Sequence, residues 1–295
     1  MSVDIVGSTA LKQNNLQDNS KIWIAAINKF NTQMSAYFMG CINSNKTKPI
    51  YEDISKLIII PDIWKSVGDE IIYKVRIKSY KVALFYILNF KESIETYVSK
   101  HYSNSETYGH LDLKATSWTA GFPVKNSILT SIQANKDFTD YIGPSMDVGF
   151  RICKFSTNRR FVIGHSLAIF LLEYKSDHLK IIYQGKQKIH GIDKDYPIIY
   201  IQMNNKRIKD DEFVLTNACE PDGTKLLDYL KSDKKNEVPF LSECEFFDTI
   251  SEQYKELFTF QLKYIDKDTN INSYDDTNVS DIDPCEFIEE YLISK

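Results

Sequence analysis

The chain has 295 residues, of which 43% are hydrophobic and 26% charged, so it can bury a core and is not a disordered protein. A formal net charge of −4 argues against a general nucleic-acid binder, which would normally have a strongly basic surface. Five widely spaced cysteines without a CxxC pair argue against a zinc site and a disulfide framework, and they favour a reducing, cytoplasmic compartment. No apolar stretch approaches the length of a membrane span, so we expect no membrane partner. The acidic charge balance leads us to expect no nucleic-acid partner either.

Strand-like and helix-like patterns alternate through most of the chain and indicate an α/β or α+β fold. In chain order they predict a strand at 3–6, a helix at 25–41, two β-rich runs between 50 and 77 that meet in a turn at 67–69, a helix at 80–101, a strand pair between 109 and 128, a helix at 146–155, and β-rich runs at 180–184 and 196–203.

The composition changes after residue 204. Charged helical segments follow, and then a polar stretch at 267–284 that is rich in Asp and Asn and typical of a mobile segment. We therefore expect a first domain at 1–204 and a mainly helical C-terminal extension at 205–295. Residues 285–295 are typical of a short docking helix.

The first chemical motif is DIVGST at residues 4–9. Asp4 ends a predicted strand, and the turn Gly7-Ser8-Thr9 opens a predicted helix. Such a turn can present backbone N–H groups to a phosphate while the neighbouring acid holds a metal ion. An ordinary helix cap beside a solvated Asp gives the same pattern.

The second motif is KSVGD at residues 65–69, which places Asp69 at the tip of a predicted hairpin. Gly-Asp is also an everyday turn pair. Two carboxylates on neighbouring strands can, however, bridge two divalent cations, and Mn²⁺ or Mg²⁺ suits such oxygen ligands. Asp4 and Asp69 are the candidates for that pair.

The third motif lies at residues 140–161. Asp147 and Arg151 are four positions apart and share one face of a predicted helix. An arginine aimed at a phosphate offsets the charge that develops in a transition state. Surface ion pairs would explain the same residues.

Together, and in this order over residues 2–203, the three motifs resemble the class III nucleotidyl cyclases. That family shows D-I-x-G-x-T, then K-x-x-G-D, then D-x-x-G-x-x-x-N-x-x-x-R. The resemblance implies an α+β fold with a ferredoxin-like βαββαβ core in residues 1–204, which would be the catalytic domain. It also implies two metal ions per site, held by Asp4, Asp69 and the main-chain carbonyl of Ile5. Arg151 matches the family's arginine that stabilises the transition state.

The chain departs from the family pattern at two positions. Asp147 stands where the family has an asparagine that orients the ribose. His190 precedes Gly191 where the family has a lysine on the terminal phosphates, so His190, with Lys186 or Lys188 as a substitute cation, is expected there.

Three segments resemble the sequences of the pyrimidine cyclases of the Pycsar anti-phage systems: DIVGST, MDVGFRICKFSTNRRFVIGHS and HGIDKDYPIIYI. This resemblance implies conversion of UTP or CTP into cyclic UMP or cyclic CMP, a signal that a separate effector protein reads. It also implies a homodimer with its active sites at the interface. Tyr51 and Trp64 are candidate fillers that shorten the base pocket, although both suit a core as well.

Two other functions stay open. Lys65 and Asp140 match the positions that read adenine in adenylate cyclases, so a conventional adenylate cyclase that makes cyclic AMP is one alternative. The other is an inactive cyclase-like protein that senses a nucleotide or a phage component.

Overall fold

The computed structural model describes residues 1–14, 21–102, 111–122, 126–133, 136–173, 179–192, 195–204 and 223–232. They belong to two compact units, one of residues 1–119 and 148–237 and one of residues 120–147 and 238–295. In the described part of the chain, no helix is both long and apolar enough to cross a membrane. The predicted mobile segment and docking helix lie outside the described residues, and the predicted domain boundary at residue 204 stays a prediction.

The first unit contains one mixed sheet with the strand order β2-β3-β1-β4-β7-β9-β8. Its strands are β1 (Ser2–Val6), β2 (Asp62–Val67), β3 (Glu70–Lys74), β4 (Asp112–Ser117), β7 (Arg160–Ile163), β8 (Ile181–Gln187) and β9 (Tyr196–Gln202). Its helices are α1 (Ser8–Asn14), α2 (Lys21–Lys46), the 3₁₀ helix η1 (Pro49–Leu57), α3 (Tyr80–His101), the 3₁₀ helix η2 (Cys153–Phe155), α5 (His165–Glu173) and α6 (Gly223–Ser232). Helix α4 (Pro144–Ile152) begins in the second unit and ends in the first.

The order of the elements β1-α2-β2-β3-α3-β4 forms the core of this unit. Strands β3 and β4 flank β1, both antiparallel to it, and β2 lies outside β3. This is the βαββαβ arrangement of a ferredoxin-like fold. The predicted α+β class and its core are therefore confirmed, and β7, β9 and β8 extend the sheet beyond β4.

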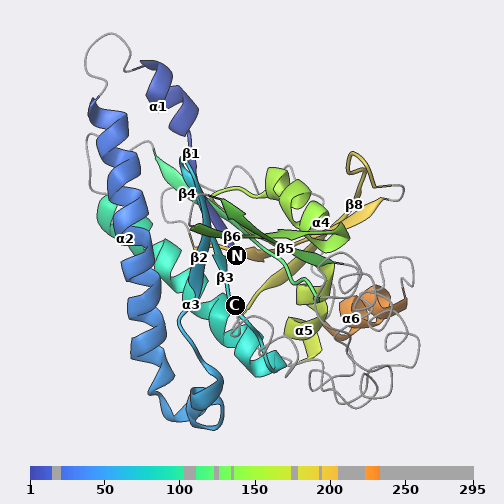
Figure 1. Ribbon diagram of the computed structural model, residues 1–295. Coiled ribbons are helices and arrows are strands. Elements are labelled where there is room, and N and C mark those ends of the chain that lie inside the picture. The colour runs from blue at the N-terminus through green and yellow to red at the C-terminus, as the bar shows by residue number, and fades with distance from the viewer. Residues whose placement is uncertain are drawn as a thin grey trace. The chain divides into compact units, whose positions relative to one another are not determined.

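Helices α2 and α3 lie side by side over one face of the sheet (Figure 1). Phe30, Met34 and Phe38 recur every four residues on α2 and are almost fully buried, as expected for the inward stripe of a helix. Phe90 of α3 lies at the centre of this layer. Its ring centroid is 5.0 Å from that of Phe38 of α2 and 5.7 Å from that of Phe161 of β7.

Strand β1 separates this apolar layer from a polar surface. Val3 pairs with Ile71 and Ala115, all of them buried, whereas the next residue along, Asp4, pairs with Glu70 and Lys114. Because successive side chains of a strand point to opposite faces, these two sets lie on opposite sides of the sheet. The side that carries Asp4 is called the polar face below.

The second unit contains the antiparallel hairpin β5 (Ser127–Gln133) and β6 (Lys136–Ile142). Asn126 links the two segments that flank this hairpin. The side-chain amide of Asn126 donates to the carbonyl of Gly121 at 2.8 Å, and its side-chain oxygen accepts from the N–H of Ser145 at 3.1 Å. Asp140 of β6 pairs with Leu129 of β5.

Several predicted elements agree with the structure. Helix α3 has the predicted bounds because the hydroxyl of Ser79 caps it, accepting from the N–H of Val82 at 3.2 Å. The hairpin turn at 67–69 and strands β1 and β9 also lie where the patterns place them, and β8 starts as predicted but continues three residues beyond 184.

Two of the predictions were wrong. The beginning of the β-rich run at 50–77 is the helix η1, which starts at Pro49 because proline suits the first turn of a helix. The expected strand pair at 109–128 does not form, since β4 joins the large sheet and β5 pairs with β6. Strand β7 and helix α5 were not expected, because their buried residues show neither the alternation of a half-exposed strand nor a polar helix face.

The helix layer generates a stability prediction. Phe90→Ala should lower the free energy of unfolding by about 3–5 kcal/mol, because it leaves a cavity among packed aromatic rings. Urea unfolding of the full chain measures this loss. Ile50→Ala, at a side chain that is 57% exposed, is the control and should change it by no more than about 0.5 kcal/mol. Equal losses in the two variants would contradict the assignment of Phe90 to the core.

Candidate functional site

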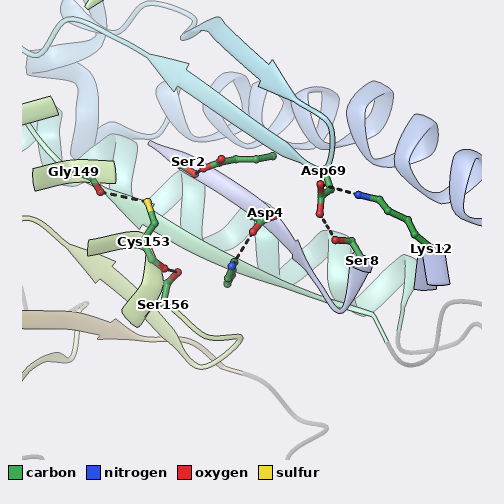
Figure 2. A network of polar contacts seen from close by, with 10 residues as sticks. Ser2, Asp4, Ser8, Lys12, Asp69, Gly149, Cys153 and Ser156 are labelled. Carbon is green, nitrogen blue, oxygen red and sulfur yellow. Dashed lines mark hydrogen bonds and ion pairs between the residues drawn. The ribbon is translucent and has the colours of Figure 1, made fainter. Parts of the chain in front are cut away.

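Asp4 and Asp69 lie close together on the first unit (Figure 2). Asp69 occupies the two-residue turn between β2 and β3, which begins with Gly68 at φ +65°, a conformation that suits tight hairpins. The N–H of Ile5 donates to the carbonyl of Asp69 at 3.2 Å, which ties the hairpin tip to the end of β1. The side chain of Ile5 is buried, so only its main chain is available to the site.

Asp4 forms an ion pair with Lys114, which is directly opposite on β4, and the Oδ2–Nζ distance is 2.9 Å. Burial raises the pKa of the Asp4 carboxyl, and the hydrogen bond from Lys114 only partly offsets this effect. The negative charge of Asp69 raises the pKa of Asp4 further. Asp4 is thus an acid whose ionised form depends on a nearby cation.

Asp69 has different surroundings. Its carboxylate accepts a hydrogen bond from the hydroxyl of Ser8 and pairs with the ammonium of Lys12 at 3.2 Å, both from α1 (Figure 2). Burial works to raise the pKa of Asp69, but the bonds from Ser8 and Lys12 outweigh burial, so the pKa is lowered. Thr9, on the same turn, is exposed. Gly7 directly precedes this helix at φ +82°, and its carbonyl accepts a hydrogen bond from the N–H of Leu11 at 3.0 Å.

A cavity of about 240 Å³ opens beside Asp4 on the polar face. Its lining residues are Ser2, Asp4, Glu70, Lys114, Thr116, Cys153, Lys154 and Ser156. Burial raises the pKa of the Cys153 thiol to about 11, so this thiol stays protonated at neutral pH and is no nucleophile. The cavity therefore offers hydroxyl and ammonium groups beside the two carboxylates of Asp4 and Glu70.

The donor set around the two acids suits a hard divalent cation. Among the described residues, no group of three or more His, Cys, Asp or Glu side chains gathers as a metal site. Asp4 and Asp69 nevertheless each hold an ammonium group, which is a stand-in for a bound cation. Carboxylate and main-chain oxygens are the ligands that Mg²⁺ and Mn²⁺ prefer, so the residues fit the expected ions.

Arg151 lies against the turn that contains His190 and Gly191. A Cβ placed on Gly191 would be 2.2 Å from the Nη1 of Arg151, and Gly191 has φ +74°. In the described part of the chain this buried Nη1 has no hydrogen-bond partner. A buried guanidinium donor without a partner is costly unless a ligand satisfies it, and a phosphate oxygen is a suitable acceptor.

The other phosphate candidates lie near the same turn in the sequence. Lys186, Lys188 and His190 are all exposed, and the Nζ of Lys186 lies 5.7 Å from the ring centroid of Tyr229 in α6. Asp140 and Asp147 belong to the second unit, Asp140 on β6 and Asp147 in the first turn of α4.

Of the candidate base-reading residues in the first unit, the structure brings Trp64 and Lys65 together. Trp64 is the extra residue of a β-bulge in β2, so it and Lys65 both oppose Ile72, and the Lys65 ammonium lies 4.4 Å from the Trp64 ring centroid. The Trp64 ring also packs against Phe150 of α4, with the ring centroids 6.0 Å apart.

Tyr51 lies elsewhere. It belongs to η1, and its ring centroid is 4.8 Å from that of Phe85 on α3, in the helix layer. The structure thus does not bring Tyr51 to the polar face.

Sequence reasoning missed Lys12, Lys114 and the close approach of Gly191 to Arg151. The alternation of β4 could have indicated that Lys114 shares a face with Thr116. Its pairing with Asp4 depends on strand register, which no local pattern reports.

The opposite environments of the acids generate a pH prediction. Because the pKa of Asp69 is lowered in the folded protein, its ionised form adds stability that is lost as the pH falls through the folded pKa. Ser8→Ala should raise the pKa of Asp69 and reduce this loss. Carboxyl NMR titration and unfolding at several pH values measure both effects. Thr9→Ala removes a neighbouring hydroxyl that is exposed, and a shift of equal size there would refute the role of Ser8.

No known protein family matches the chain by its sequence, and no curated protein matches it either. Solved structures do. The adenylyl cyclase CyaB from P. aeruginosa is 13% identical, with a TM-score of 0.49 over 70% of this chain and 93% of that one. The guanylyl cyclase Cya2 is 12% identical, with a TM-score of 0.44 over 68% and 88%. The guanylate cyclase domain of RhGC from Catenaria anguillulae, in complex with GTP, is 10% identical, with a TM-score of 0.43 over 69% and 94%. These are similarities of backbone arrangement, and the function proposed below depends on this chain's own residues.

Proposed function

We propose that this chain is a nucleotidyl cyclase, a phosphorus–oxygen lyase that converts UTP or CTP into 3′,5′-cyclic UMP or cyclic CMP and pyrophosphate. The observation that carries the proposal is the pair of acids from distant parts of the sequence, Asp4 and Asp69, each of which already holds a cationic group. Asp4 also lines an open cavity. The cyclic product would act as a second messenger in anti-phage defence and be read by a separate effector protein.

Each part of the site has a role in this reaction. Asp4, Asp69 and the carbonyl of Ile5 would hold two Mn²⁺ or Mg²⁺ ions. When bound, such ions lower the pKa of the 3′-hydroxyl and coordinate the triphosphate. The 3′-hydroxyl loses its proton to solvent, the bond from the 3′-oxygen to the α-phosphorus forms, the bond from the α-phosphorus to the oxygen that bridges to the β-phosphate breaks, and pyrophosphate leaves. The buried Nη1 of Arg151 would offset the charge that develops on the α-phosphate.

The remaining phosphates need their own donors. The turn of Gly7, Ser8 and Thr9 lies next to Asp69 and can offer backbone N–H groups to them. His190 lies in the turn against which Arg151 packs, and Lys188 precedes that turn in the chain. Both side chains are exposed and could reach a terminal phosphate. Asp147 would orient the ribose, as the asparagine at its position does in the cyclase family.

The base preference rests on Trp64. Its indole and the ring of Phe150 fill the space beside Lys65 on the polar face, which supports a pocket shortened for a pyrimidine. Adenylate cyclase activity is the second candidate, favoured by the place of Lys65 on that same face and by its match, with Asp140, to adenine-reading residues. The identity of the product separates the two.

We also propose a two-fold homodimer in which Arg151 of one protomer serves the acids of the other. Each protomer carries both sets of residues, so a two-fold interface would create two equal sites. Analytical ultracentrifugation of the full chain measures the mass directly, and a strict monomer under turnover conditions would contradict this arrangement.

The proposed reaction is tested with purified protein, Mn²⁺ and each of ATP, GTP, CTP and UTP, with products identified by mass spectrometry. We expect a cyclic pyrimidine nucleotide from the wild type and none from Asp69→Ala. Asp62→Ala, at an exposed carboxylate on the other end of β2, is the matched control and should stay active. Arg151→Ala should slow turnover by roughly 10²–10³-fold. Cyclic AMP as the product would establish the adenylate cyclase, and no product from any nucleotide would favour the inactive sensor.

Gly191 provides a second test of Arg151. Gly191→Ala should displace the guanidinium and reduce turnover to nearly the level of Arg151→Ala, because the added methyl group overlaps with Nη1. Gly185→Ala is the matched control: it also has a positive φ of +102°, but no described atom lies within 4 Å of its added Cβ. Steady-state rates for the two variants decide the matter, and equal losses would mean that backbone strain alone is responsible.

A further inference from the structure

We propose that Lys114 is an internal counter-ion of Asp4, which a divalent cation must displace from the carboxylate, so that Lys114 sets how tightly the site binds metal. This inference rests on the proposed function, because it concerns the same acid. It assigns to Lys114, a residue outside all three sequence motifs, a direct part in metal loading.

The position of Lys114 is held by the backbone. Asp4 and Lys114 are cross-strand partners in the β1–β4 ladder, and their charged atoms are 2.9 Å apart. Directly opposed residues of a ladder have Cβ atoms about 4.5–5.5 Å apart. The ammonium therefore has only a short distance to span, and the sheet itself keeps it beside the carboxylate.

Both side chains are partly shielded from water. Their exposed fractions are 33% for Lys114 and 25% for Asp4, and both line the cavity on the polar face. At such positions a charge pair is screened less than on an open surface. The pair is thus a real competitor for an incoming cation.

Asp69 is held in the same way by Lys12, at 3.2 Å. The two acids and the two lysines balance in charge without any metal ion. A divalent ion on Asp4 would lie within a few ångströms of the Lys114 ammonium, where like charges repel. Metal binding and the Asp4–Lys114 pair therefore exclude each other.

The cavity offers the displaced ammonium another place. Glu70 lines the same cavity and pairs with Asp4 from the other side of β1, and the hydroxyl of Ser2 already donates to it. A bound triphosphate would present further anionic oxygens to the same space. Lys114 can thus leave Asp4 without losing every anionic partner, which makes the displacement reversible.

The experiment measures Mn²⁺ binding to the full chain without nucleotide, by the EPR signal of free Mn²⁺ during a titration. Lys114→Met should bind Mn²⁺ at least about threefold more tightly than the wild type, since a partly exposed ion pair of ordinary strength is lost. Lys114→Arg keeps the charge and should bind as the wild type does. Lys114→Gln, which keeps a polar side chain, repeats the test if the methionine variant does not fold.

Lys154→Met is the matched control. Lys154 lines the same cavity, but its ammonium lies 4.8 Å from the ring centroid of Phe155. The variant removes the same charge without touching the Asp4 pair and should leave Mn²⁺ affinity at the wild-type value. An equal gain in Lys114→Met and Lys154→Met would overturn the proposal, because the effect would then be one of overall charge.

The remaining outcomes separate this proposal from the proposed function. If the wild type binds Mn²⁺, Asp4→Asn weakens that binding and Lys114→Met leaves it unchanged, the role of Lys114 is refuted while the cyclase proposal stands. If wild type, Asp4→Asn and Lys114→Met all fail to bind Mn²⁺ at millimolar concentration, the metal site itself is absent and both proposals fail.

Discussion

The alternation of side chains along β1 is the constraint on which the site depends. Val3 and Ile5 are buried, while Asp4 between them points to the polar face. A shift of one residue in register would place the Asp4 carboxyl in the aromatic core, at a prohibitive cost in desolvation. The helix layer therefore holds the acid in place as firmly as any contact of the acid itself.

The two acids are alike in type but differ in environment. Burial raises the pKa of Asp4, whereas the donors Ser8 and Lys12 lower the pKa of Asp69 in spite of burial. The charge of Asp69 is thus supported by α1, and the charge of Asp4 depends on whichever cation lies beside it. This asymmetry supports the proposed role of the cross-strand lysine on β4, because among the described residues Asp4 has only that ammonium group as its ion-pair partner across the strands.

Close packing at glycines positions the arginine. A Cβ on Gly149 of α4 would lie 2.3 Å from the Trp118 ring, so this helix can approach the end of β4 only without a side chain there. Two residues further along the chain, Arg151 packs against Gly191, where an added Cβ would lie 2.2 Å from its Nη1. The guanidinium of this α4 residue is therefore packed against the turn at Gly191, with its buried Nη1 unpaired among the described residues.

The sequence by itself determined the alternation of helices and strands, the bounds of α3 and the hairpin tip at Asp69, because capping and turn chemistry are local. The ferredoxin-like core and the grouping of Asp4, Asp69 and Arg151 as candidates followed from the order of three motifs that resemble one family. Only the tertiary structure decided that Lys114 pairs with Asp4, that Gly191 receives Arg151, that Tyr51 packs in the helix layer, and that β4 and β5 separate. Each of these depends on strand register or on contacts between segments that are distant in the sequence. No local sequence pattern reports such contacts.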